Sequence, residues 1–262
     1  MSRITRLFEH KKNNILNVYC TAGFPSLDSL GQVMHALEKN GADIIEIGMP
    51  YSDPLADGPV IQASSTRALS NGMSLSILFN QINEMRNASF PGGKMEIPVL
   101  LMGYLNPILQ YGFERFCRDA ASAGVDGLIL PDLPIFEFES QYSKIIRRYG
   151  LDFIFLVTPE TSEERIRKLD ALSQGFIYAV SSSSTTGKDK DMSAQRAYFE
   201  RLQQMRLNNP ILIGFGIRDR ESFRQACEYA NGAIIGTAYI QAIDRGEDIE
   251  ISTKKFLDGI LR

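Results

Sequence analysis

The sequence predicts a single-domain α/β fold, a (β/α)8 TIM barrel, and three observations lead to this prediction. The chain has 262 residues, a length that suits one large barrel or two small domains. Short apolar runs alternate with helical segments eight times along the chain, which favours a parallel sheet closed into a barrel. No linker-like break interrupts this alternation. We therefore expect one barrel domain over residues 1–262, with an extra N-terminal helix and a mobile loop after the sixth strand.

The strands are predicted from runs of about five to seven apolar and β-branched residues, as in fully buried parallel strands. They are Ile15–Cys20, Asp43–Gly48, Pro98–Gly103, Val125–Leu130, Asp152–Val157, Gly175–Ser181, Pro210–Gly214 and Gly232–Gly236. An open, doubly wound sheet is the alternative. It is less favoured because no run resembles the Gly-x-Gly-x-x-Gly turn of a dinucleotide-binding fold.

The helices are predicted from apolar residues at helical spacing, first in the segment that contains Leu30, Val33 and Leu37. Glycine is frequent just after a helix, because it adopts the left-handed conformation at low cost. Four glycines that precede strands therefore predict helix ends. They are Gly41, Gly124, Gly150 and Gly232. The run Thr161-Ser162-Glu163-Glu164 predicts a helix start with a capping box.

The composition narrows the class of protein. The 28 basic and 31 acidic residues give a formal net charge of -3, so there is no positive excess to neutralise a nucleic acid. Cys20, Cys117 and Cys227 match no metal-ligand spacing and cannot all pair, which favours a reducing compartment. No apolar run approaches the roughly 20 residues of a membrane span, and the first residues are not a signal sequence. We expect a soluble, cytoplasmic protein.

Carboxylates are the expected acid–base groups, because His10 and His35 are the only histidines. Glu46 stands among isoleucines in the second strand, and barrels carry their active sites at the carboxyl ends of the strands. Burial should raise the pKa of Glu46, so that it can both give and take a proton. The alternative is a rim glutamate paired with a basic residue. The proline-rich loop that follows holds Asp53 and Asp57 on a stiff backbone.

A phosphate site is predicted where the last two strands end, at Gly214-Phe215-Gly216 and at Gly236-Thr237. Barrels often bind phosphate there, through backbone N–H groups that glycine leaves accessible. The Ser- and Thr-rich segment after the sixth strand, which ends in Thr186-Gly187, has two interpretations. It is either a solvated loop or a lid that closes over the phosphate.

The run Glu46-Ile47-Gly48-Met49-Pro50-Tyr51-Ser52-Asp53-Pro54-Leu55-Ala56-Asp57-Gly58-Pro59 resembles the signature of the tryptophan synthase alpha subunit family. Further similar segments follow in the family's order over nearly the whole chain. The resemblance implies a lyase of tryptophan biosynthesis that splits indole-3-glycerol phosphate into indole and glyceraldehyde 3-phosphate. It implies no cofactor in this chain. It also implies a partner, the pyridoxal-phosphate-dependent beta subunit, in an alpha2-beta2 heterotetramer.

The resemblance also assigns roles to residues. Glu46 is the general acid–base that protonates the indole ring carbon, and Asp57 accepts a hydrogen bond from the indole N–H. Four residues line the indole pocket, namely Tyr19, Leu101, Ile129 and Tyr178. Four hold the phosphate, namely Gly187, Gly216, Gly236 and Thr237. Further substrate-binding residues are Tyr104, Thr186 and Phe215, and the partner interface includes Pro50, Asp53, Asn106 and Pro107.

Two departures from the family pattern concern the phosphate end. The segment after the sixth strand carries Ser182 and Ser184, where the family more often has other residues, glycine in the second case. Thr237 stands where serine is common and keeps the hydroxyl. Neither departure affects the two acids.

Three alternative functions are weighed against this one. A free-standing lyase would perform the same chemistry without a beta subunit. A binding protein would dock on and activate a beta subunit while turning over poorly, but the presence of both Glu46 and Asp57 favours catalysis. A metal-dependent sugar-phosphate epimerase would need several histidine ligands, which two histidines outside the predicted strand ends do not supply.

Overall fold

A computed structural model describes residues 1–87, 94–180, 192–214 and 216–262. Within these ranges, nine strands form one parallel sheet in the order β5-β4-β3-β2-β1-β9-β8-β7-β6. Their bounds are β1 Ile15–Thr21, β2 Ile44–Gly48, β3 Val99–Met102, β4 Gly127–Ile129, β5 Asp152–Phe153, β6 Leu156–Val157, β7 Ile177–Val180, β8 Ile211–Gly214 and β9 Gly232–Ile235.

The sheet closes on itself through β5 and β6. These two strands are the ends of the sheet order, yet only Ile154 and Phe155 separate them along the chain. They are the two halves of the single strand predicted over Asp152–Val157. The first half pairs with β4 and the second with β7, so one chain segment joins both edges. The predicted barrel is confirmed, and the open doubly wound sheet is wrong.

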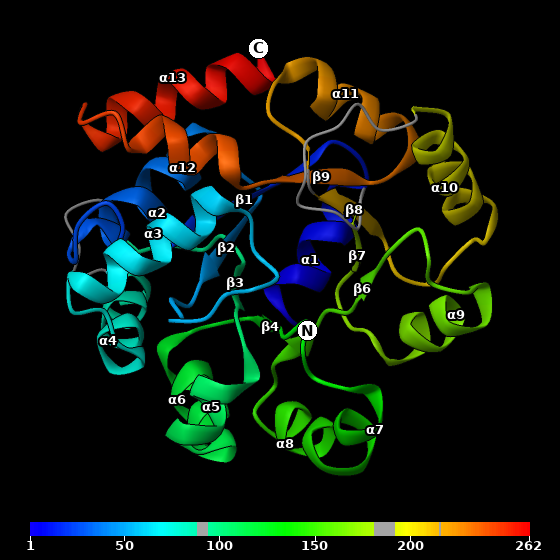
Figure 1. Ribbon diagram of the computed structural model, residues 1–262, viewed down its shortest axis with the longest axis horizontal. Helices are drawn as coiled ribbons and strands as arrows, with labels where there is room; N and C mark the ends of the chain where they lie inside the picture. Colours follow the sequence, from blue (N-terminus) through cyan, green and yellow to red (C-terminus); the bar gives the residue numbers. More distant parts are fainter. Residues whose placement is uncertain (88–93, 181–191, 215) are drawn as a thin grey trace.

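Helices surround the barrel (Figure 1). They are α1 Arg3–His10, α2 Ser29–Asn40, α3 Pro59–Ser70, α4 Leu75–Arg86, α5 Leu105–Tyr111, α6 Phe113–Ala123, α7 Ile135–Glu137, the π-helical turn Phe138–Tyr142, α8 Ser143–Arg148, α9 Glu163–Leu172, α10 Met192–Gln204, α11 Arg220–Tyr229, α12 Thr237–Ile243 and α13 Ile249–Leu261. Helix α1 is the predicted extra helix, and it lies in the middle of the ring. No described helix has the length and apolar character needed to cross a membrane. The predicted mobile loop lies outside the described residues.

Two apolar clusters lie on opposite faces of the sheet. The larger one fills the space between the strands and the surrounding helices and includes Val18 and Ile47. The smaller one joins inward-facing strand residues to Ile4 and Phe8 of α1. Its other members lie in the strands or next to them, namely Ile15, Ile44, Leu100, Ile129, Ile154, Phe176, Tyr178, Val180, Leu212 and Ile234. Helix α1 therefore covers one end of the barrel interior.

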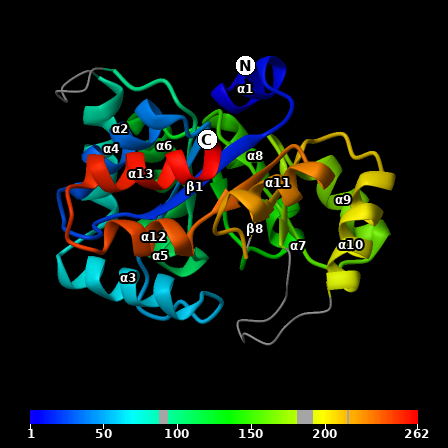
Figure 2. The same cartoon turned by 90° about the horizontal axis from the view of Figure 1, so that it is seen from above.

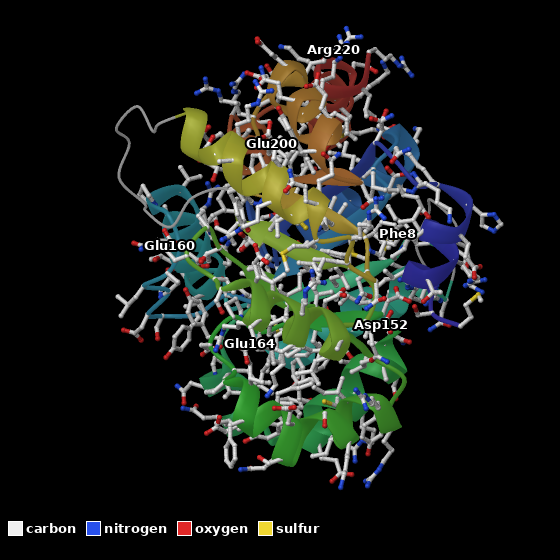
Figure 3. All side chains as sticks on the ribbon, turned by 90° about the vertical axis from the view of Figure 1, so that its right-hand side faces the viewer. Phe8, Asp152, Glu160, Glu164, Glu200 and Arg220 are labelled. Atoms are coloured by element: carbon white, nitrogen blue, oxygen red, sulfur yellow. The ribbon has the colours of Figure 1, made fainter. Side chains whose placement is uncertain are left out.

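The end covered by α1, here called the floor, is the end at which the strands begin. Helix α1 and α3 lie at opposite ends of the molecule (Figure 2). Asp152, which begins β5, lies at the same end as Phe8, while Glu160, just beyond β6, lies at the other end (Figure 3). The end at which the strands finish is called the mouth, and it is the end where barrels carry their chemistry.

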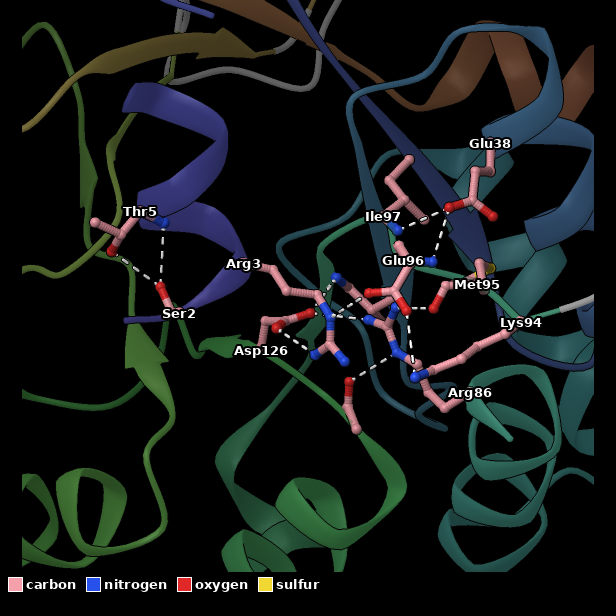
Figure 4. Close-up of polar contacts among 12 residues, drawn as sticks. Ser2, Arg3, Thr5, Glu38, Arg86, Lys94, Met95, Glu96, Ile97 and Asp126 are labelled. Atoms are coloured by element: carbon pink, nitrogen blue, oxygen red, sulfur yellow. Dashed lines mark hydrogen bonds and ion pairs between the residues drawn. The ribbon is translucent and has the colours of Figure 1, made fainter. Parts of the chain in front are cut away.

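A buried ionic network ties α1 to the floor (Figure 4). The Asp126 carboxylate accepts hydrogen bonds at 2.9 Å from Arg3 and from Arg86, and at 2.8 Å from the Val99 backbone N–H. Arg86 also donates to the carbonyl oxygens of Met95 and Gly124. Each oxygen of this buried carboxylate therefore has a hydrogen-bond partner, which offsets the cost of burying its charge.

The predicted helix signals are correct in part. Gly41 and Gly124 end α2 and α6 in the left-handed conformation, with φ of 104° and 92°. Gly232 does not end a helix but begins β9, so that prediction was wrong. A Cβ there would overlap the Ile15 carbonyl oxygen, so close approach of two strands is the reason for this glycine. Helix α9 has Ser162 as its N-cap, one residue later than the predicted capping box.

Candidate active site

Glu46 lies on the inner face of β2, near the mouth. It is aligned with Tyr19 of β1 on one side and Leu100 of β3 on the other. Parallel strands in register point aligned side chains to the same face, and Leu100 belongs to the inner cluster. The exposed fraction of Glu46 is 0%. The alternative of an exposed rim glutamate is therefore wrong.

The Glu46 carboxyl has one hydrogen-bond partner among the described residues. Its Oε2 accepts from the Asn17 side-chain amide at 2.7 Å, and its Oε1 is buried without a partner in the described chain. Burial raises the pKa of Glu46 to about 8, with the Asn17 hydrogen bond opposing the rise and the charge of Asp57 adding to it. Glu46 is thus mainly protonated at neutral pH, and one of its oxygens makes no hydrogen bond to the described residues.

Asp57 is held by the loop that follows β2. Its backbone N–H donates to the Pro54 carbonyl at 3.0 Å, and the Gln62 side chain donates to the Asp57 carbonyl at 2.8 Å. The Tyr104 hydroxyl hydrogen-bonds the Asp57 carboxylate and accepts from the Ala56 N–H at 3.1 Å. Burial raises the pKa of Asp57, while the Tyr104 hydrogen bond lowers it. The stiff loop predicted from the sequence thus brings Asp57 into electrostatic contact with Glu46.

Two tyrosines on the inner face approach the acids. Tyr19 is aligned with Glu46, and Tyr178 of β7 interacts electrostatically with both Glu46 and Asp57. Each tyrosine packs where a glycine leaves room. A Cβ on Gly48 would overlap the Tyr19 hydroxyl, and a Cβ on Gly214 would overlap the Tyr178 ring. Burial raises the pKa of both tyrosines, so they are neutral aromatic walls with a polar end.

The structure places Leu101 away from this site. Leu101 is aligned with Ile47 and packs in the outer cluster, against the helices. Leu100 and Met102 share the face of Glu46, and Ile129 is aligned with Met102 and lies in the inner cluster. The prediction that Leu101 lines the indole pocket was therefore wrong, because Leu101 lies on the outer face of the sheet. An all-apolar strand shows no alternation from which the inner residue can be chosen.

The phosphate end is described in part. β8 and β9 pair in parallel, so Gly216 and Gly236 follow neighbouring strand ends. Gly216 is exposed with a φ of 78°, which favours glycine, and Gly236 is the N-cap of α12. Thr237 is the exposed first residue of α12. Thr186, Gly187 and Phe215 lie outside the described residues, as do Ser182 and Ser184.

The residues predicted for the partner interface lie around the mouth. Asp53 and Asn106 are exposed, and Pro50 and Pro107 are half-buried. The loops after β2 and β3 contact each other. The Asn106 amide donates to the Tyr51 hydroxyl at 3.3 Å, and the rings of Tyr51 and Tyr104 lie 5.1 Å apart. Leu55, in the first of these loops, is 88% exposed.

Comparison with known proteins agrees with the resemblance. Residues 5–258 match the family described as tryptophan synthase alpha chain. The tryptophan synthase alpha chain of Bacteroides thetaiotaomicron is 48% identical over 261 residues, which cover 99% of this chain and 100% of that protein. That of Parabacteroides distasonis is 50% identical, with 99% of each chain covered.

The chain belongs to the tryptophan synthase alpha chain family.

Solved structures support the same assignment. Tryptophan synthase subunit alpha from Legionella pneumophila superposes with a TM-score of 0.88 at 34% identity, covering 99% of this chain and 97% of that one. Tryptophan synthase from M. tuberculosis, in its aminoacrylate-bound form, superposes with a TM-score of 0.83 at 32% identity, covering 99% and 100%. The role of the tryptophan synthase alpha chain family is the cleavage of indole-3-glycerol phosphate. The predictions of a lyase and of tryptophan biosynthesis are therefore confirmed.

The sequence missed two features of the site. Asn17 was not singled out, because an asparagine inside a strand gives no periodic or motif signal. Met102 was passed over because it follows two leucines of equal apolar character. Among the described residues, no cluster of His, Cys, Asp and Glu side chains could hold a metal ion.

Proposed function

We propose that Glu46 and Asp57 carry out the carbon–carbon cleavage of indole-3-glycerol phosphate in this chain. The observation that supports this most strongly is the Glu46 carboxyl, which is fully buried, has a pKa raised to about 8 and has one oxygen without a partner among the described residues. A carboxyl group with a pKa near the working pH is suited to proton transfer in both directions.

Glu46 acts first as an acid and then as a base. The protonated carboxyl donates its proton to the indole ring carbon that carries the glycerol side chain. The resulting carboxylate takes the proton of the hydroxyl on the adjacent side-chain carbon. The carbon–carbon bond then breaks, its electron pair returns to the indole ring, and the hydroxyl carbon becomes the aldehyde of glyceraldehyde 3-phosphate. Glu46 ends the cycle protonated, as it began.

Asp57 stabilises the positive charge that develops on the ring. Its ionised carboxylate accepts a hydrogen bond from the indole N–H, which becomes more acidic once the ring carbon is protonated. Tyr104 supports this role, because its hydrogen bond to the Asp57 carboxylate lowers the pKa of that group against the effect of burial. Two acids in different environments thus take two roles.

The inner face near the mouth suits a flat aromatic ring. Tyr19, Tyr178, Ile129 and Met102 come from four strands that face the same interior. We assign the indole to this region. We assign the phosphate to the backbone around Gly216, Gly236 and Thr237, where neighbouring strand ends present N–H groups, with Thr186, Gly187 and Phe215 completing the site.

The partner we propose is a tryptophan synthase beta subunit, bound at the mouth over Pro50, Asp53, Asn106 and Pro107. The complex would be an alpha2-beta2 heterotetramer in the cytoplasm, where three unpaired cysteines are expected. Pyridoxal phosphate would belong to the beta subunit. The alpha chain needs no cofactor for the steps above, because two carboxyl groups supply the proton transfers and the charge stabilisation.

A coupled assay of indole and glyceraldehyde 3-phosphate tests this function. Glu46→Gln keeps the shape of the side chain but cannot carry the proton, so indole release should fall by about 10²–10⁴-fold. Substrate should still bind to this variant. Asp57→Asn should lose less, but still substantially. Asp152→Asn is the matched control, because Asp152 is a floor carboxyl whose pKa burial also raises. Near-normal turnover by Glu46→Gln would overturn the assignment.

A further inference from the structure

Asn17 contacts Glu46 from the floor side. It lies on β1 two residues before Tyr19, so it points to the same inner face. It is aligned with Ile44, which precedes Glu46 by two residues on β2, so Asn17 is one inward position nearer the floor. Its exposed fraction is 0%, and its Nδ2 donates to Glu46 Oε2 at 2.7 Å.

On its floor side, the Asn17–Glu46 pair borders an apolar interior. The neighbouring inner residues at this depth include Ile15, Ile44 and Ile234. Asn17 Oδ1 and Glu46 Oε1 are both buried without a hydrogen-bond partner among the described residues. Leaving a buried acceptor unpaired costs free energy, about 1–3 kcal/mol for a neutral group. Leucine would fill the place of Asn17 without that cost, so stability alone does not account for an asparagine here.

The chemistry of Glu46 does account for it, and this step rests on the proposed function. During the reaction Glu46 alternates between a carboxylic acid and a carboxylate. The end of an asparagine side chain carries two N–H donors and one carbonyl acceptor. Its N–H donates to Oε2 of the carboxylate, and it donates equally to Oε2 of the carboxylic acid when the proton lies on Oε1. An aliphatic side chain does neither.

We propose that Asn17 is the positioning residue of Glu46, holding Oε2 on the floor side in both protonation states so that Oε1 alone exchanges the proton with the substrate. Asn17 itself touches no reacting atom. Its contribution is to keep one oxygen of the acid occupied and the carboxyl plane fixed, so that each proton leaves and returns at the same point. Fixed geometry of this kind supports repeated proton transfer at one atom.

The surroundings of Glu46 fix the direction of the pH effect. Among the described residues, the titratable groups that interact electrostatically with Glu46 are Tyr19 and Cys20 from β1, Tyr178 from β7 and Asp57 from the loop after β2. Burial raises the pKa of the first three, so they are neutral near pH 7. Asp57 disfavours the ionised form of Glu46, and the Asn17 amide favours it. Removing that amide should move the pKa of Glu46 further above 8.

The first test is Asn17→Leu in the full chain, assayed for indole release. We expect kcat to fall by about 10- to 100-fold with KM within about threefold of wild type, since a lost positioning contact acts mainly on the chemical step. The decline of kcat/KM at alkaline pH should also move to higher pH. Tyr239→Phe is the control, because it removes a buried hydrogen bond to Thr253 away from the acids. It should leave kcat and the pH profile unchanged.

The second test measures Glu46 without turnover. A ¹³C NMR titration of the Glu46 carboxyl should show a higher pKa in Asn17→Leu than in wild type. If that variant does not fold, Asn17→Ser serves instead, because its hydroxyl is too short to make the same bond and should give the same shift. A Glu46 titration and a kcat both equal to wild type in a folded variant would overturn the proposal. The NMR titration also separates the positioning role of Asn17 from the catalytic role of Glu46. Activity retained by Glu46→Gln would defeat the catalytic assignment, whereas the titration would still report whether Asn17 controls Glu46.

Discussion

At the scale of single residues, the site is built from two carboxyl groups in different surroundings. Glu46 is fully enclosed by strands, and burial raises its pKa to about 8. Asp57 stands on a loop at the mouth, where Tyr104 donates to it. The enclosed acid keeps its proton at neutral pH, and the acid on the loop loses its proton more readily. This separation supports the acid–base role proposed for Glu46 and the charge-stabilising role proposed for Asp57.

Burial of Glu46 also makes stability depend on pH. The folded-state pKa of about 8 lies above the ordinary value of 4.5. The folded protein therefore holds this proton more tightly than the unfolded chain, and the stability gained from it is present below pH 4.5 and is lost as pH rises to about 8. Glu46→Gln should thus be close to wild type in stability near pH 4.5 and more stable by on the order of 4 kcal/mol near pH 9. Urea unfolding at both pH values measures the difference, and a constant difference across the range would contradict it.

The candidate site residues that the sequence could single out are those with a local chemical signal. Glu46 is an acid in an apolar strand, and Asp57 follows it in a proline-rich loop, so both could be recognised without coordinates. Leu101 and Leu100 differ only in the face to which they point, and that depends on the pairing of β3 with β2. Asn17 became recognisable only when β1 brought it against Glu46.

At the scale of elements, the same glycine signal has different causes in different places. Gly41 and Gly124 end helices because their backbone is left-handed. Gly232 has no such requirement. It lies where β9 approaches β1 so closely that a Cβ would overlap the Ile15 carbonyl oxygen. The sequence predicted strands from apolar runs and was close to their true bounds, but the distance between two strands is a property of the folded sheet.

Two alanine substitutions separate these causes. Gly232→Ala forces a methyl group into the backbone of β1 and should lower the free energy of unfolding by at least about 1–3 kcal/mol. Gly259→Ala is the matched control, because Gly259 lies in α13 with no atom within 4 Å of its added Cβ. Alanine should raise the stability of that helix by about 0.5–1 kcal/mol. Chemical denaturation of both variants checks the prediction, and equal destabilisation would contradict the cause given for Gly232.

At the scale of the whole molecule, the paired ionic network and the proposed catalytic acids lie at opposite ends of the barrel. The floor carries α1 and the Asp126 network. In this network both oxygens of the Asp126 carboxylate accept hydrogen bonds. The mouth carries Glu46 and Asp57, whose pKa values burial raises, and an oxygen of Glu46 without a described partner. Eight strand–helix repeats were enough to predict this barrel. Its closure could be seen only in space, where the two halves of one predicted strand pair with β4 and β7.

The exposed mouth also predicts how the chain meets its partner. Leu55 is a large apolar side chain that is 88% exposed, in the loop that also holds Asp57. Burying it against a beta subunit would both strengthen binding and restrict the loop that positions Asp57, so the partner should raise turnover as it binds. Indole release by the wild-type chain should therefore increase when beta subunit is added. An unchanged rate at saturating beta subunit would instead favour a free-standing lyase.

Leu55→Ser tests the surface directly. Loss of one well-packed apolar contact should weaken binding of the beta subunit by about 5- to 30-fold, which corresponds to about 1–2 kcal/mol. Ile251→Ser is the matched control, because Ile251 is also apolar and 63% exposed, but lies on α13 rather than on a mouth loop. Calorimetric titration of each variant with beta subunit measures the affinities. A loss of affinity in Ile251→Ser with none in Leu55→Ser would place the partner on the outer helices, and the mouth would then be free to admit substrate without it.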